Sequence, residues 1–129
     1  MIATAKRLMV IGLLALLSSC SPPPIDVSVD RVDGRLRFTL SQDWGFLFSD
    51  RQTPCLRELG LYKPGSYDRQ EAVWLIEAKG DVQCLDLASV VVGEVPGGWR
   101  QVVGFSPVRG RTYTLRAQGI GWGETSVSL

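Results

Sequence analysis

Apolar and polar residues alternate strictly over residues 25–30 and again over residues 35–40. This two-residue period is typical of strands with one buried face. The pair Asp33-Gly34 lies between the two runs, and an Asp-Gly pair in this position favours a tight two-residue turn. We therefore predict a β-hairpin whose apolar side chains lie on one face.

Further strands are predicted where short apolar runs lie between glycine- and proline-containing turns. They comprise residues 55–62, 85–95, 113–117 and 125–129. The turns that separate them lie at residues 63–66, 96–98 and 119–123. Several short strands without a convincing long helix predict an all-β fold, a small two-sheet β-sandwich.

Residues 68–80 allow two interpretations. Asp68 and Glu71 have the spacing of a helix capping box, and Gly80 would end such a helix. Residues 73–76 are instead a compact run of β-branched and aromatic side chains, which is typical of a strand. We favour the strand because the surrounding segments all predict β-structure.

The end of the chain resembles the last two strands of fibronectin type III and immunoglobulin-like domains. In that pattern a Pro and a Gly precede a strand that begins with Tyr, and a Gly-rich turn leads to the final strand. Here these features are Pro107, Gly110, the run from Tyr113 to Ala117, and residues 119–123. The resemblance implies an immunoglobulin-like sandwich.

The two-residue period also assigns individual side chains to the core or to water. The residues expected in one core are Leu36, Phe38, Leu40, Tyr113 and Leu115. The residues expected to face water are Arg35, Arg37, Thr114 and Arg116. A shift of register by one residue would bury the arginines without partners, which costs far more than a strand pairing returns.

The first residues have the pattern of a secretory signal. Lys6 and Arg7 precede an apolar run over residues 8–17, and small residues follow it. The run is shorter than the roughly 20 apolar residues that a helix needs to cross a bilayer. We therefore predict a cleaved signal-peptide helix comprising residues 1–19.

The sequence Leu17-Ser18-Ser19-Cys20 resembles the lipobox of bacterial lipoproteins. That resemblance implies lipidation of the Cys20 sulfur, cleavage before this residue, and acyl chains such as palmitate on the new N-terminus. Two or three acyl chains give stable membrane anchoring, whereas one chain gives only marginal binding. The lipobox, the prolines after it and the Gly-Trp pairs also look like small lipoproteins of Gram-negative bacteria.

A short spacer follows the lipobox. Ser21 takes the place where an Asp would favour retention in the inner membrane, so the resemblance implies sorting to the outer membrane, on its periplasmic face. Residues 20–24 include three prolines, which hold a domain about 10 to 15 Å from the lipid. Residues 25–129 are then expected to form one domain close to the cell-envelope membrane.

Two cysteines remain for the exported domain, Cys55 and Cys84. The compartment that an exported chain reaches is oxidising, so we predict a disulfide bond between them. A two-cysteine metal or redox site is the alternative, but the spacing is not C-x-x-C and the chain contains no histidine. With no catalytic motif either, we expect no enzyme, no metal site and no cofactor.

The charge of the chain is close to balanced. The full sequence has 14 basic and 13 acidic residues, and loss of Lys6 and Arg7 with the signal leaves 12 basic residues. A nucleic-acid partner normally requires a basic excess. We therefore expect no nucleic-acid partner.

Four aromatic residues are the candidate binding residues. Trp44 and Phe46 alternate after the end of a predicted strand, and Trp99 and Trp122 lie beside glycines in predicted turns. Exposed aromatic clusters mark binding surfaces. The alternative is that these rings fold back to cap the ends of the sandwich, and Trp74, inside a predicted strand, is expected in the core on either interpretation.

Two classes of function remain open. The first is a non-enzymatic lipoprotein that binds a protein partner or assists envelope assembly. The second is a binder of a glycan or small ligand, or an inhibitor of an envelope-attacking enzyme. A flat apolar patch or an exposed strand edge would favour the first class, and a concave aromatic groove with convergent polar groups would favour the second.

Overall fold

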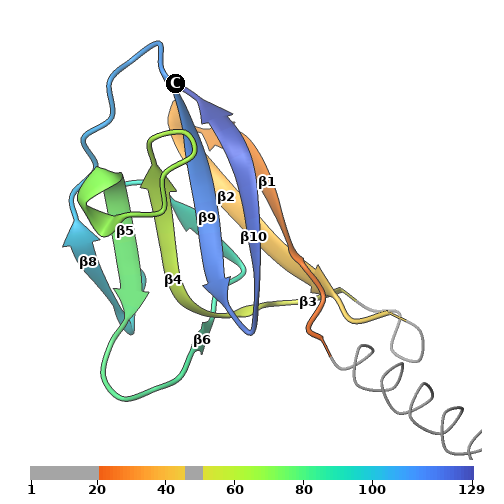
Figure 1. Cartoon of the computed structure of the whole chain (residues 1–129). Coiled ribbons are helices and arrows are strands. Elements are labelled where there is room, and N and C mark those ends of the chain that lie inside the picture. Colours follow the sequence, from red (N-terminus) through yellow and green to blue (C-terminus); the bar gives the residue numbers. More distant parts are fainter. Residues whose placement is uncertain (1–20, 46–50) are drawn as a thin grey trace, which may run out of the picture.

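The computed structural model describes residues 21–45 and 51–129, and the predicted all-β sandwich is confirmed (Figure 1). The predicted signal helix, Cys20 and Phe46 lie outside the described residues. The elements are β1 (Ile25–Val32), β2 (Arg35–Asp43), β3 (Arg51–Gln52), β4 (Cys55–Tyr62), the 3-10 turn η1 (Arg69–Glu71), β5 (Ala72–Ala78), β6 (Leu85–Asp86), β7 (Ser89–Val91), β8 (Trp99–Val103), β9 (Thr112–Gly119) and β10 (Gly121–Ser128). Within this part of the chain, no helix is long and apolar enough to cross a membrane.

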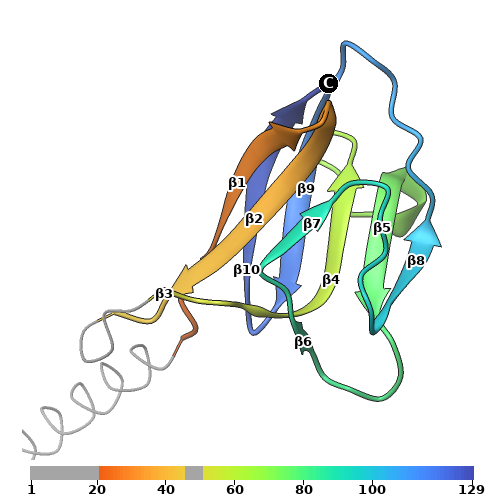
Figure 2. The same cartoon turned by 180° about the vertical axis from the view of Figure 1, so that it is seen from behind.

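The strands form two antiparallel sheets that face each other (Figures 1 and 2). In the smaller sheet β1 pairs with β2, and both β7 and β3 pair with β2. The larger sheet has the order β10-β9-β4-β5-β8, with β6 beside β4. The orders β1-β2-β7 and β10-β9-β4-β5 correspond to the A-B-E and G-F-C-C′ sheets of immunoglobulin-like sandwiches.

The hairpin predicted for residues 25–40 is present. Val32 pairs with Arg35, so Asp33 and Gly34 form a two-residue loop. Both loop residues have positive φ, 51° and 78°, which is the backbone of a type I′ turn. An Asp-Gly pair tolerates this conformation at low cost, and the hairpin therefore closes in a single register.

The core lies between the two sheets as the two-residue period predicts. All five residues assigned to the core are buried, and Phe38 and Leu115 are fully enclosed. Phe38 packs against Trp74 across the core, with ring centroids 6.1 Å apart. The four residues assigned to water lie on the outer faces, where Arg35 is exposed and Arg37, Thr114 and Arg116 are half-buried. All described strands and core residues lie within residues 25–128, so residues 21–129 contain the whole core.

The strand interpretation of residues 68–80 is confirmed. Asp68 does cap a turn, since its side chain accepts a hydrogen bond from the backbone N–H of Gln70. The turn is only the short η1, after which the chain enters β5. Burial of alternate side chains of β5 in the core outweighs the local capping signal.

The single strand predicted over residues 85–95 is wrong. β6 pairs with β4 in the larger sheet, and β7 pairs with β2 in the smaller sheet. The chain therefore crosses between the sheets near Leu87, whose N–H donates to the carbonyl of Pro54. Apolar residues recur on both sides of the crossing because Leu85, Leu87 and Val90 all pack in the same core, so the sequence pattern does not separate the two short strands.

The predicted disulfide bond between Cys55 and Cys84 is confirmed, with Cα atoms 5.3 Å apart. It joins the first residue of β4 to the loop that precedes β6. Both of these strands belong to the larger sheet. The bond therefore fixes the end of the connection between β5 and β6 to the start of β4.

The spacer before β1 is bound to the domain by Gln42. This side chain is 1% exposed, and its amide nitrogen donates to the carbonyls of Pro23 and Ile120, each at 2.8 Å. Gly121 follows with φ of 91°, and a Cβ there would meet the same amide nitrogen and the carbonyl of Pro23. The chain therefore enters the domain beside the β9–β10 turn.

Candidate functional site

Three of the four candidate aromatic residues lie in the described part of the chain, and they differ in exposure. Trp44 and Trp122 are 43% and 56% exposed, whereas Trp99 is 2% exposed. Phe46 lies outside the described residues. The structure therefore leaves Trp44 and Trp122 as exposed rings and removes Trp99 from the binding surface.

Trp99 is not in a turn as predicted but is the first residue of β8. It pairs with Ala78 of β5, and its N–H donates to the carbonyl of Pro96. Its side chain belongs to the core cluster. Gly97 and Gly98 form the turn just before it, which is why the sequence placed the ring in the loop. The alternative interpretation, a ring folded into the sandwich, holds for Trp99.

Trp122 lies on the outer face of the larger sheet, beside Arg116 and Tyr67. The Arg116 guanidinium is 4.2 Å from the centre of the Tyr67 ring and 5.8 Å from that of Trp122. Tyr67 belongs to the β4–β5 connection and is also 56% exposed. Two exposed rings on either side of a cation form a small aromatic surface.

A network of ion pairs continues across the same face. Glu77 of β5 is only 6% exposed, and it pairs with Arg69 and Arg100. Arg69 also pairs with Glu58 at 3.1 Å. Because each acidic group here has a cationic partner, this network holds the β4–β5 connection and β8 onto the sheet rather than offering a free charge.

Tyr62 is buried under this network. A Cβ on Gly60 would lie 2.8 Å from its ring and 2.9 Å from Leu75, so Gly60 leaves the space in which the ring packs. Burial, followed by the nearby Glu58 carboxylate, raises the pKa of the Tyr62 phenol above its ordinary value of about 10. The phenol stays neutral and serves packing.

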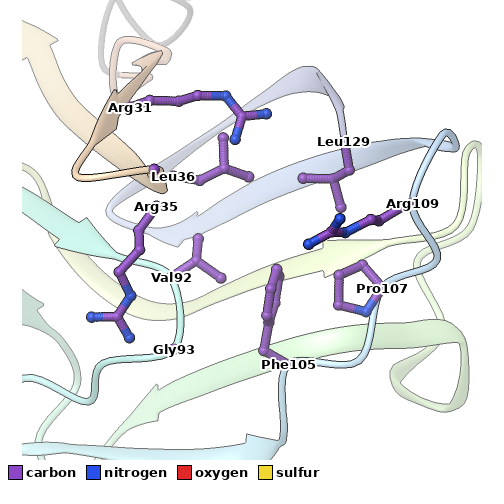
Figure 3. A pocket seen from close by; sticks show the side chains of 10 residues that line it. Arg31, Arg35, Leu36, Val92, Gly93, Phe105, Pro107, Arg109 and Leu129 are labelled. Atoms are coloured by element: carbon purple, nitrogen blue, oxygen red, sulfur yellow. The ribbon is translucent and has the colours of Figure 1, made fainter.

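A cleft of about 670 Å³ opens at one end of the sandwich (Figure 3). Its floor and walls are apolar and its rim carries three arginines. The apolar side chains are Leu36, Val92, Phe105, Pro107 and Leu129, and the arginines are Arg31, Arg35 and Arg109. A concave apolar surface with convergent polar groups is the usual form of a ligand site.

The arginines of the cleft are not equivalent. Arg35 forms an ion pair with Glu94 at 3.1 Å. Within the described parts of the chain, Arg31 and Arg109 form no ion pair. Figure 3 shows both of these side chains reaching over the apolar floor, whereas Arg35 turns aside towards Gly93. The cleft therefore presents two arginines, Arg31 and Arg109, that form no ion pair among the described residues.

The cleft lies at the opposite end of the sandwich from the spacer (Figure 1). Its walls are the β1–β2 turn, the segment after β7, the β8–β9 connection and the residue after β10. Ile25 pairs with Gln42 at the spacer end of the hairpin, and Val32 pairs with Arg35 at the cleft end. The length of the strands separates the two ends.

The sequence did not predict this cleft. Arg31 and Arg35 flank the predicted Asp33-Gly34 turn, Arg109 lies between Pro107 and Gly110, and Phe105 precedes a Ser-Pro pair. These signals were present, but three separate loops meet only in the folded sandwich. Among residues 21–45 and 51–129, no group of His, Cys, Asp and Glu is arranged to hold a metal ion.

No protein-family model, no curated protein and no solved structure matches the chain. The geometry of the cleft and of the surface around Arg116 is therefore the basis for a function.

Proposed function

We propose that the protein is a lipid-anchored, non-enzymatic binding module of the bacterial cell envelope, which receives its partner in the cleft. The observation that carries this proposal is the opposition of spacer and cleft. The spacer leaves the sandwich at the Gln42 end, and the cleft opens at the Arg35 end. An anchor at the spacer end would leave the cleft open to the compartment.

The proposed anchor is lipid on Cys20, on the periplasmic face of the outer membrane. The lipobox resemblance and the binding of Pro23 to the domain support it, because the domain begins only a few residues after Cys20. Cys20→Ala should leave an unlipidated precursor at full length. Recovery of the variant at mature size in the membrane fraction would refute the anchor.

The proposed partner is an envelope protein. A photo-reactive amino acid at Phe105, which lines the cleft, should yield an adduct of discrete mass in intact cells. The same amino acid at Lys79, an exposed residue of the β5–β6 connection, is the matched control. Identical adducts from both positions, or none from Phe105, would contradict a binding role for the cleft.

A second candidate function is glycan binding or inhibition of an envelope-attacking enzyme. The exposed rings of Tyr67 and Trp122 beside Arg116 support it, because stacking rings suit sugar faces. Trp122→Ala should then abolish retention on an immobilised envelope glycan while Phe105→Ala leaves it intact. The reverse pattern would favour the cleft.

A further inference from the structure

We propose that the cleft binds an amphipathic anion, a carboxylate or phosphate group attached to an apolar chain or ring. This inference rests on the proposed function and adds the chemistry of the ligand. The group reaches the cleft either as a free small molecule or as part of the envelope partner, and the tests below distinguish the two. A volume of about 670 Å³ is within the usual range of such sites.

The apolar part of the cleft favours a ligand with an apolar chain or ring. Leu36 and Val92 are core residues, 7% and 4% exposed, whose edges form the floor. Phe105 stands above them and is 41% exposed. A bound alkyl chain or ring would cover this phenyl group and remove apolar surface from water.

The walls of the cleft are held in place by backbone hydrogen bonds. The N–H of Ser106 donates to the carbonyl of Val73 at 2.8 Å, which ties the Phe105 segment to β5. The N–H of Gly110 donates to the carbonyl of Leu129 at 2.7 Å, which ties the Arg109 segment to β10. A site whose walls are already ordered loses less entropy when a ligand binds.

The charge of the rim selects the head group. No acidic side chain is among the described residues that line the cleft, and of its three arginines only Arg35 forms an ion pair there. The guanidinium groups of Arg31 and Arg109 are therefore available to an incoming group (Figure 3). A planar guanidinium binds carboxylate and phosphate oxygens in pairs, and it repels a cationic head group.

Solution NMR with ¹⁵N-labelled residues 21–129 tests the inference, with decanoate and decyl phosphate as probes below their micelle-forming concentrations. We expect saturable shifts of the Gly93, Phe105 and Leu129 amides. Decyltrimethylammonium has the same chain with a cationic head, and butyrate has the anion with little chain, so both should bind far more weakly. Tighter binding of decanoate would identify a carboxylate ligand, and tighter binding of decyl phosphate a phosphate ligand.

Substitutions of two rim arginines test how much each contributes to the affinity for the probe. Arg31→Gln and Arg109→Gln should each weaken the preferred probe about fivefold, the change expected when one exposed charge-assisted hydrogen bond is lost. Lys79→Gln removes the same charge at the opposite end of the domain and should leave the dissociation constant unchanged. Because Arg31, Arg109 and Lys79 are all exposed, the amide spectra should report an unchanged fold.

Absence of binding by both anionic probes would overturn the inference, and so would any of three further results. These are equal binding of the cationic probe, shifts that lie away from the cleft, and an effect of Lys79→Gln equal to that of Arg109→Gln. An adduct formed specifically from Phe105 in cells, together with no binding of either anionic probe, would refute the amphipathic anion while leaving the binding function standing. Loss of the adduct with intact probe binding would refute the protein partner instead.

Discussion

The hydroxyl of Tyr113 accepts a hydrogen bond from the backbone N–H of Val108, five residues upstream, at 2.7 Å. Tyr113 is 3% exposed and lies near the start of β9. The same arrangement closes the corner before the corresponding strand of immunoglobulin-like domains. The residue that carried the sequence resemblance therefore has a defined structural role, which is to hold the β8–β9 connection.

Tyr113→Phe should destabilise the domain. It removes the acceptor of the Val108 N–H, and loss of a buried hydrogen bond costs about 1 to 2 kcal/mol. Urea unfolding of residues 21–129 measures the change. Tyr67→Phe removes an exposed hydroxyl and is the matched control. Equal stability of the two variants would show that the Tyr113 bond contributes nothing.

Phe38→Ala should strongly destabilise the domain, since Phe38 is fully buried against Trp74. We expect a loss of about 3 to 5 kcal/mol. Arg37→Ala, at the neighbouring position, should leave the unfolding free energy nearly unchanged, because the Arg37–Asp30 ion pair is solvent-exposed. Thermal melts that rank the two variants in the opposite order would contradict the assigned faces of β2.

Removal of the disulfide should lower stability by about 3 to 4 kcal/mol. The estimate follows from the loop that it closes, because Cys55 and Cys84 are 29 residues apart. The double variant Cys55→Ser/Cys84→Ser should unfold at the same denaturant concentration with and without reductant. The native chain should match it only when reduced, and a native chain insensitive to reductant would argue against the bond.

Burial of the Tyr62 phenol makes the stability of the domain fall at alkaline pH. Its folded-state pKa lies above the ordinary value of about 10, so the unfolded chain loses this proton first as the pH rises. The stability from the neutral phenol is present in full below pH 10 and declines as the pH rises through the folded-state pKa. In urea titrations from about pH 9 to about pH 11, Tyr62→Phe should show a shallower fall than the native chain. Parallel curves would mean that ionisation of the Tyr62 phenol does not contribute to the loss of stability at high pH.

Gln42→Leu should release the spacer and destabilise the domain. It leaves the carbonyls of Pro23 and Ile120 without their donor, at a cost of about 1 to 3 kcal/mol. Gln52→Leu changes an exposed glutamine on the paired strand β3 and is the control. Amide hydrogen exchange should accelerate at Ile25, the first residue of β1, in the first variant alone.

The sequence predicted those features that depend on neighbouring residues. The two-residue period identified the hairpin and its buried face, and Asp33-Gly34 identified its turn. The cysteine pair followed from composition and compartment, without knowledge of the topology.

The sequence did not predict features that depend on how distant segments meet. Trp99 was placed in a turn because its glycine neighbours hide the short strand that it begins. Residues 85–95 were predicted as one strand because apolar residues recur on both sides of the crossing between the sheets. The cleft requires Arg31 and Arg109 to line the same site, and 78 positions separate them in the chain.

The hydrogen bond between Gln42 and Pro23 limits the distance between the domain and the proposed lipid. Because the Pro23 carbonyl is held, only Ser21 and Pro22 lie between the proposed lipid on Cys20 and the body of the domain, a span of about 6 Å. The eight residues of β1 add about 26 Å along the hairpin. The domain would then stay close to the membrane surface, because the free part of the spacer is short. The opening of the cleft would keep a nearly constant height of about 30 Å, and a partner in the same membrane would have to project that far to meet it.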